Sequence, residues 1–85
     1  MPKALHSERY QSFRTLLIER RKDAGLTQAA LAERLSKPQS YVAKYEKGER
    51  RLDVVEFVEV AEAIDFDAAE FVSAYVDQIL NDLKA

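Results

Sequence analysis

The chain has 85 residues and a formal net charge of −2 at pH 7, with no cysteine, two glycines and two prolines. This length fits one small domain over residues 1–85, the lack of cysteine excludes a disulfide framework and thiolate metal sites, and no apolar run is long enough to span a bilayer. The opening stretch MPKALHSERY also lacks the apolar segment of a secretory signal, which predicts a soluble cytoplasmic protein. The small number of helix-breaking residues and the lack of the apolar–polar alternation typical of strands favour an all-α domain.

The first predicted element is a helix over about residues 7–24. Ser7 is a good N-cap, and Gly25 suits the left-handed position that follows a helix end. The apolar residues of this segment recur at helical spacing and are expected to face inward, namely Tyr10, Phe13, Leu16 and Leu17.

Two short helices follow, separated by a break. One is expected over about residues 28–35 with Thr27 as its N-cap, and the other over about 38–47, since a proline is tolerated in a first helical turn. The residue before Pro38 avoids the α region, so the two helices cannot be continuous. Gly48 ends the second one. The expected inward faces are Leu31, Ala32 and Leu35 on the first helix, and Val42 and Tyr45 on the second.

Two more helices are predicted in the remaining sequence. The fourth covers about residues 53–64, with Asp53 as its N-cap, and the fifth covers about residues 67–83. The expected inner face of the fourth helix is Val54, Val55, Val58, Ala61 and Ile64. The placement of Phe57 on this helix is ambiguous.

The two short helices have the spacing of a helix-turn-helix. A steep and close crossing needs a small residue on the first helix, and Ala32 supplies it. The turn needs a residue that tolerates unusual backbone angles, and Ser36 occupies that place. The second helix needs an inward apolar anchor, which is Val42.

The segment AGLTQAALAERLSKPQSYVAKYEKGERRLDVVEFVEVAEAI resembles the phage-repressor and Cro type of helix-turn-helix domain, over about residues 10–65. The chain is also similar to the controller proteins of restriction–modification systems, which have one extra C-terminal helix. The resemblance implies a compact all-α, five-helix bundle of lambda-repressor-like type, with the third helix in the DNA major groove. Ser36 departs from the usual glycine of the turn, and Ala30 stands where a capping box with Thr27 would need Glu or Gln.

The third helix and the residues after it carry the side-chain types that bind DNA. Gln39 and Ser40 can read base edges, and Lys44, one turn further, can reach guanine or a phosphate. Tyr41 either contacts phosphate or a thymine methyl, or packs on the domain. The positively charged residues after the helix are expected to bind phosphates. For the two arginines, a contact in the minor groove is the alternative. The candidates are Gln39, Ser40, Tyr41, Lys44, Lys47, Arg50 and Arg51.

Further roles follow from the resemblance. Gln28 matches a residue that contacts the DNA backbone from the start of the second helix, where a helix N-terminus attracts phosphate. Arg21 and Glu46 match an ion pair that links the first helix to the third and orients the recognition helix. The alternative for each is an ordinary solvated side chain.

The charge distribution supports a DNA partner although the net charge is negative. Residues 1–51 contain twelve Lys and Arg against six Asp and Glu, a balance of +6, whereas residues 52–85 contain one against nine, a balance of −8. This split predicts a basic half that binds DNA and an acidic half that faces elsewhere.

The fifth segment is more apolar than a helix that covers one flank needs to be. Part of it is expected to complete the core, and the surplus suggests a self-complementary two-fold interface. The residues expected in this dimer interface are Phe71, Tyr75, Val76, Ile79, Leu80 and Leu83.

The sequence therefore predicts a homodimeric transcriptional regulator that binds double-stranded DNA at a pseudo-palindromic operator. A protein-interaction module of the same fold, such as an antitoxin-like partner, is the alternative. No cofactor, metal, small-molecule ligand, membrane or enzymatic activity is expected, because His6 has no partner ligand and the carboxylates of Glu56, Glu59 and Glu62 have the spacing of a solvated helix face.

Overall fold

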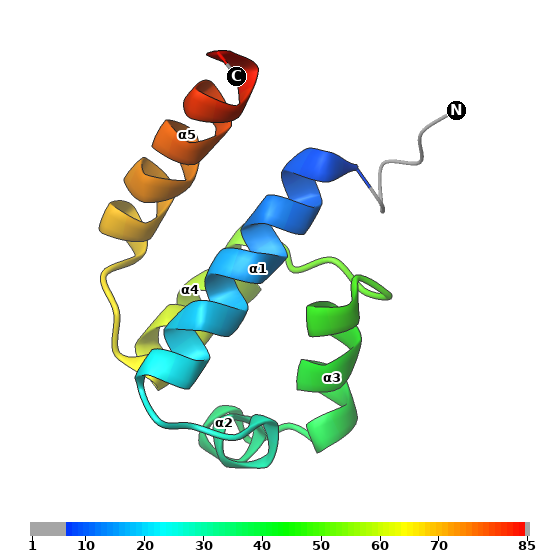
Figure 1. The fold of residues 1–85 in the computed structure, drawn as a ribbon. Helices are drawn as coiled ribbons and strands as arrows, with labels where there is room; N and C mark the ends of the chain where they lie inside the picture. Colours follow the sequence, from blue (N-terminus) through cyan, green and yellow to red (C-terminus); the bar gives the residue numbers. More distant parts are fainter. Residues whose placement is uncertain (1–6, 85) are drawn as a thin grey trace.

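The computed structural model describes residues 7–84, which form five α-helices and no strand. The bounds are α1 (Glu8–Asp23), α2 (Gln28–Leu35), α3 (Gln39–Lys47), α4 (Val54–Ile64) and α5 (Ala68–Lys84). Figure 1 shows α3 and α5 on opposite sides of α1, with α5 antiparallel to α1 and α2 closing one end. The all-α prediction and the five predicted segments are confirmed. His6 lies outside the described residues.

Side-chain caps fix where four of the helices begin. Ser7 and Thr27 each accept a hydrogen bond from the backbone N–H three residues later, at 3.1 and 3.0 Å. Asp53 accepts the N–H of Glu56 at 2.7 Å, and the Glu56 carboxylate accepts the N–H of Asp53 at 3.0 Å, which completes a capping box. Asp67 accepts two N–H groups of the first turn of α5. None of the five helices is long and apolar enough to cross a membrane.

An aromatic cluster fills the core between α1, α4 and α5. The ring centroids of Phe57 and Phe71 are 5.1 Å apart, and each lies 5.7 Å from the ring of Phe13. Phe66, in the connection between α4 and α5, lies 5.2 Å from Phe71. Aromatic contacts of this kind, whether tilted, edge-on or stacked, stabilise a core beyond the area that they bury.

The buried face of α4 differs from the predicted one. Val54, Val55 and Val58 are 76%, 66% and 39% exposed, so their assignment to the core was wrong. The helix carries two overlapping apolar stripes, each with helical spacing. The stripe that contains Phe57 is the buried one, because it packs against the aromatic cluster. The residues of α4 that are buried are Phe57, Val60, Ala61 and Ile64.

Helix α5 likewise carries two apolar stripes side by side. Phe71 is fully buried in the core of its own chain, and Tyr75 packs edge-on against Phe13 and donates a hydrogen bond to the Arg9 carbonyl at 2.7 Å. The predicted place of Phe71 in a dimer interface is therefore wrong, because no face of its side chain is left for a partner. A second set of residues, the outer stripe, remains 45–68% exposed: Val72, Val76, Leu80 and Leu83.

Candidate nucleic-acid interface

The turn between α2 and α3 has the geometry that a steep crossing requires. Ser36 adopts φ 57° and ψ 42°, a left-handed conformation that costs a residue other than glycine about 1–2 kcal/mol. The N–H of Lys37 donates to the Ala32 carbonyl at 3.0 Å and closes the end of α2. Ala32 is 2% exposed and Val42 is fully buried. The roles predicted for these positions of the motif are confirmed.

Helix α3 has one buried side and one polar, exposed side. Val42 and Tyr45 are buried in the core, whereas the first turn presents Gln39 and Ser40 to solvent. Lys44 and Lys47 continue the exposed side toward the C-terminus of the helix, one and two turns beyond Ser40. The structure thus brings four of the predicted DNA-binding residues together on one exposed side of α3, and Figure 1 shows this helix at the edge of the molecule.

A buried ion pair attaches this helix to α1. Arg21 donates to both oxygens of Glu46, from Nε at 2.7 Å and from Nη2 at 3.1 Å, and the two residues are only 8% and 6% exposed. The third nitrogen of Arg21 donates to the Leu26 carbonyl at 2.8 Å. The amide of Gln28 donates to the same carboxylate at 2.8 Å. Gln28 is therefore part of this network, and one of its two amide hydrogens remains for another acceptor.

Arg14 is a second attachment of α3 to α1. Its Nη1 donates to the backbone carbonyl of Glu46, the residue whose carboxylate binds Arg21. Because Arg14 and Arg21 are seven residues apart, they lie on the same side of α1, and between them they hold the main chain and the side chain of one residue of α3. Sequence reasoning missed Arg14, although a cation three residues before the buried Leu17 was a signal of an inward-facing arginine.

Gly48 makes room for Arg14, and this predicts the effect of a substitution. We expect Gly48→Ala to destabilise the fold by more than about 2 kcal/mol, since φ is 85° there and the added Cβ would lie 3.0 Å from the Nε of Arg14. Gly25→Ala is the matched control, because φ is 75° but nothing lies within 4 Å of the added Cβ. Urea unfolding measures both. Equal losses in the two variants would show that Arg14 does not depend on Gly48.

Arg50 and Tyr41 are held together beside the start of α4. The Arg50 guanidinium lies 4.8 Å from the centroid of the Tyr41 ring and donates to both oxygens of Glu56, at 3.1 and 2.6 Å. This pairing, with the N–H of Asp53, lowers the pKa of the Glu56 carboxyl to about 2. Glu56 thus differs from the solvated carboxylate that the sequence predicted. Burial raises the pKa of the half-buried Tyr41 hydroxyl.

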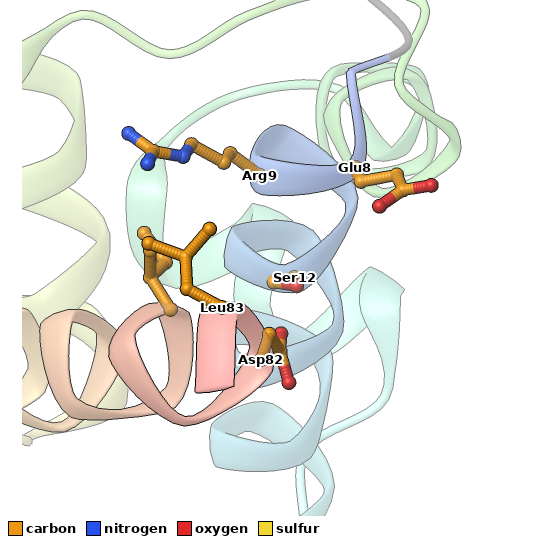
Figure 2. A pocket seen from close by; sticks show the side chains of 6 residues that line it. Glu8, Arg9, Ser12, Asp82 and Leu83 are labelled. Carbon is orange, nitrogen blue, oxygen red and sulfur yellow. The ribbon is translucent and has the colours of Figure 1, made fainter. Parts of the chain in front are cut away.

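The last predicted DNA-binding cation, Arg51, is exposed and lies 4.3 Å from the centroid of the Tyr10 ring. Among residues 7–84 no group of three or more His, Cys, Asp or Glu could hold a metal ion. A pocket of about 150 Å³ lies between the first turns of α1 and the end of α5. Figure 2 shows Leu83 beside Arg9 in this pocket.

Comparison with known proteins places this arrangement in a family. A helix-turn-helix family model, HTH_3, matches residues 17–71. An XRE-family like protein from Pseudomonas syringae pv. tomato str. DC3000 is 45% identical, with a TM-score of 0.82 over 86% of this chain and 89% of that one. No curated protein matches significantly.

Two more distant structures share the fold. A point mutant of the restriction–modification controller protein C.Esp1396I is 19% identical, with a TM-score of 0.79 over 87% of this chain and 99% of that one. The clp gene regulator ClgR from C. glutamicum is also 19% identical, with a TM-score of 0.73 over 86% of this chain and 95% of that one. The predicted resemblance is confirmed. The chain belongs to the XRE-type helix-turn-helix family and is a DNA-binding transcription regulator.

Proposed function

We propose that the chain binds a specific, pseudo-palindromic operator as a homodimer and reads it with the exposed side of α3. The observation that carries the proposal is the composition of the exposed side of α3. Its amide, hydroxyl and ammonium groups lie on the opposite side of the helix from the buried Val42 and Tyr45. A helix of this kind fits the major groove, where each base pair presents a distinct pattern of donors and acceptors.

Base recognition is assigned to the first turns of α3. The Gln39 amide can pair with N6 and N7 of adenine, and the Ser40 hydroxyl can donate or accept. Lys44 lies one turn from Ser40 on the same side and reaches guanine or a phosphate. Tyr41 stands between Ser40 and the buried Val42, so its ring borders the same surface.

Phosphate binding is assigned to the cations around this surface and to α2. Lys47 and Arg51 are exposed next to the C-terminus of α3, where they neutralise the DNA backbone. Gln28 begins α2, and its remaining amide hydrogen adds a donor at a helix N-terminus. The acidic α4 and α5 would repel DNA from the other sides and so favour approach by α3.

Dimerisation is assigned to the outer stripe of α5, with a second copy of the chain as its partner. The four residues follow each other at steps of four, four and three, so they form one continuous line on the helix. Val54 of α4 and Val72 line a common apolar pocket of about 230 Å³, which extends the surface onto α4. Figure 1 shows α5 and α3 on opposite sides of α1, so pairing through α5 leaves the DNA-reading side of each copy open.

The double variant Gln39→Ala/Ser40→Ala tests base recognition. We expect each lost contact to cost about 1–3 kcal/mol on the preferred site and to relax the preference at one base position. Selection of bound duplexes from a random pool, followed by titration at several salt concentrations, measures both effects. Lys47→Ala is the control, since it should weaken binding to all sequences alike. An unchanged preference in the double variant would contradict base reading by α3.

The same titration distinguishes DNA binding from the alternative function, a protein-interaction module. If the folded wild-type chain binds no duplex at low salt, the DNA-binding role fails. The exposed Val54, Val55 and Val58 of α4 would then favour a protein-interaction module that keeps the fold.

A further inference from the structure

Arg50 differs from the exposed lysines of α3 in having its charge already paired. Lys44 and Lys47 are exposed and form no ion pair among the described residues, whereas the Arg50 guanidinium forms two parallel hydrogen bonds to Glu56. Planar pairing of this kind is the strongest form of Arg–carboxylate contact. A phosphate would have to displace a carboxylate in order to take its place.

Glu56 is itself held from a second direction. Its carboxylate also accepts the backbone N–H of Asp53, as part of the capping box that begins α4. The Glu56 side chain is 23% exposed and that of Arg50 is 38% exposed, so the pair is partly shielded from solvent. The position of the Arg50 guanidinium is thus set by the first turn of α4, which the capping box holds in place.

The guanidinium also donates a hydrogen bond to the Arg51 carbonyl at 3.2 Å, and it packs on the Tyr41 ring, on the recognition helix. The cation lies 4.8 Å from the ring centroid, within the range of a cation–π interaction. The ammonium of Lys37 lies 5.3 Å from the same centroid, and the Tyr45 ring packs edge-on against it at 5.9 Å. With these three neighbours the ring has little freedom to change its rotamer.

We propose that Glu56 is a specificity-determining positioning residue, which holds Arg50 against Tyr41 so that the ring presents a fixed surface beside Lys44, three residues further along the recognition helix. Arg50 then acts on the ring and does not neutralise a phosphate. The inference deepens the proposed function and rests on it. An aromatic ring held in one place can contact a thymine methyl or the sugar next to it, and it excludes base pairs whose groups clash with it.

The salt dependence of DNA binding distinguishes this role from a phosphate contact. In Arg50→Met we expect the slope of log K against log salt to stay at the wild-type value, while the preference for the selected site over a random duplex falls roughly fivefold or more, the lower end of the cost of one mismatched base pair. Lys47→Ala, the comparison, should reduce the slope by about 0.9.

Glu56→Gln tests the same contact from the carboxylate side. Glutamine keeps an oxygen for the Asp53 N–H, so the capping box is retained, but it releases the Arg50 charge. We expect a steeper salt slope, by up to about 0.9, together with a weaker site preference. Glu59→Gln is the matched control: it removes the same charge one turn further along α4, from an exposed residue that forms no ion pair within residues 7–84.

A measurement without DNA separates failure of this inference from failure of the proposed function. The NMR signals of the Tyr41 ring should shift in Arg50→Met and Glu56→Gln, and they should shift less in Glu59→Gln, because Glu59 acts on Tyr41 through its charge alone. If wild type binds DNA but Arg50→Met reduces the salt slope as Lys47→Ala does, or if Glu56→Gln and Glu59→Gln behave alike, the positioning role is overturned and the DNA-binding role stands. If wild type binds no DNA, both fail, whatever the ring signals show.

Discussion

Replacement of Arg21 by Met is expected to lower the free energy of unfolding by about 3–5 kcal/mol and to weaken DNA binding with it. The Glu46 carboxylate is almost fully buried and receives two of its hydrogen bonds from Arg21. Methionine fills much of the same space but leaves that carboxylate with the Gln28 amide alone. Because Glu46 belongs to the last turn of α3, its rearrangement would also tilt the DNA-reading side.

Urea unfolding followed by circular dichroism measures the loss of stability, and titration of the selected duplex measures the loss of affinity. Lys22→Met is the matched control, since it removes a positive charge from the neighbouring, exposed position of α1. A double-mutant cycle with Glu46→Gln isolates the pair: we expect the double variant to lose much less than the sum of the single losses. Additive losses would show that the two residues do not interact.

Leu80→Glu is expected to give a folded monomer that binds the operator roughly 100-fold more weakly or worse, because the two half-sites are no longer bound as one unit. Leu80 is 50% exposed in the middle of the outer stripe. In a dimer, each Å² of apolar surface that the stripe removes from water contributes about 25 cal/mol, and a carboxylate buried there without a partner would oppose association. Two third helices on one side of the duplex would read inverted half-sites about one helical turn apart.

Sedimentation at micromolar concentration, beside circular dichroism, tests this expectation. Gln78→Glu is the control, because it adds the same charge at an exposed position of α5 away from the outer stripe. It should leave both the dimer and the affinity unchanged. A wild-type chain that sediments as a monomer, alone and on DNA, would refute the proposed interface.

Features that depend on neighbouring residues in the chain were predictable from the sequence. The caps at Ser7, Thr27 and Asp53 each require one side-chain oxygen and a backbone N–H three residues away. The close crossing at Ala32 follows from residue size, whereas the turn at Ser36 was predicted from the spacing of the helix-turn-helix, because serine itself disfavours the left-handed conformation. The Arg21–Glu46 contact spans 25 residues, and only the resemblance to known helix-turn-helix domains pointed to it.

Only the tertiary structure decided which of two acceptable apolar stripes became the core. On α4, periodicity suits Val54 and Val58 as well as Phe57 and Val60, and the aromatic rings of α1 and α5 selected the second pair. The same packing on α5 enclosed Phe71 and left the outer stripe in solvent. The partners of Arg14 and Arg50 could not be predicted for a related reason. The sequence does not indicate which distant carbonyl, carboxylate or ring the fold brings next to a charged side chain. The sequence alone thus determined where the helices begin and which turn joins α2 to α3, because those interactions are local, whereas burial and ion pairing depend on which surfaces of separate helices meet.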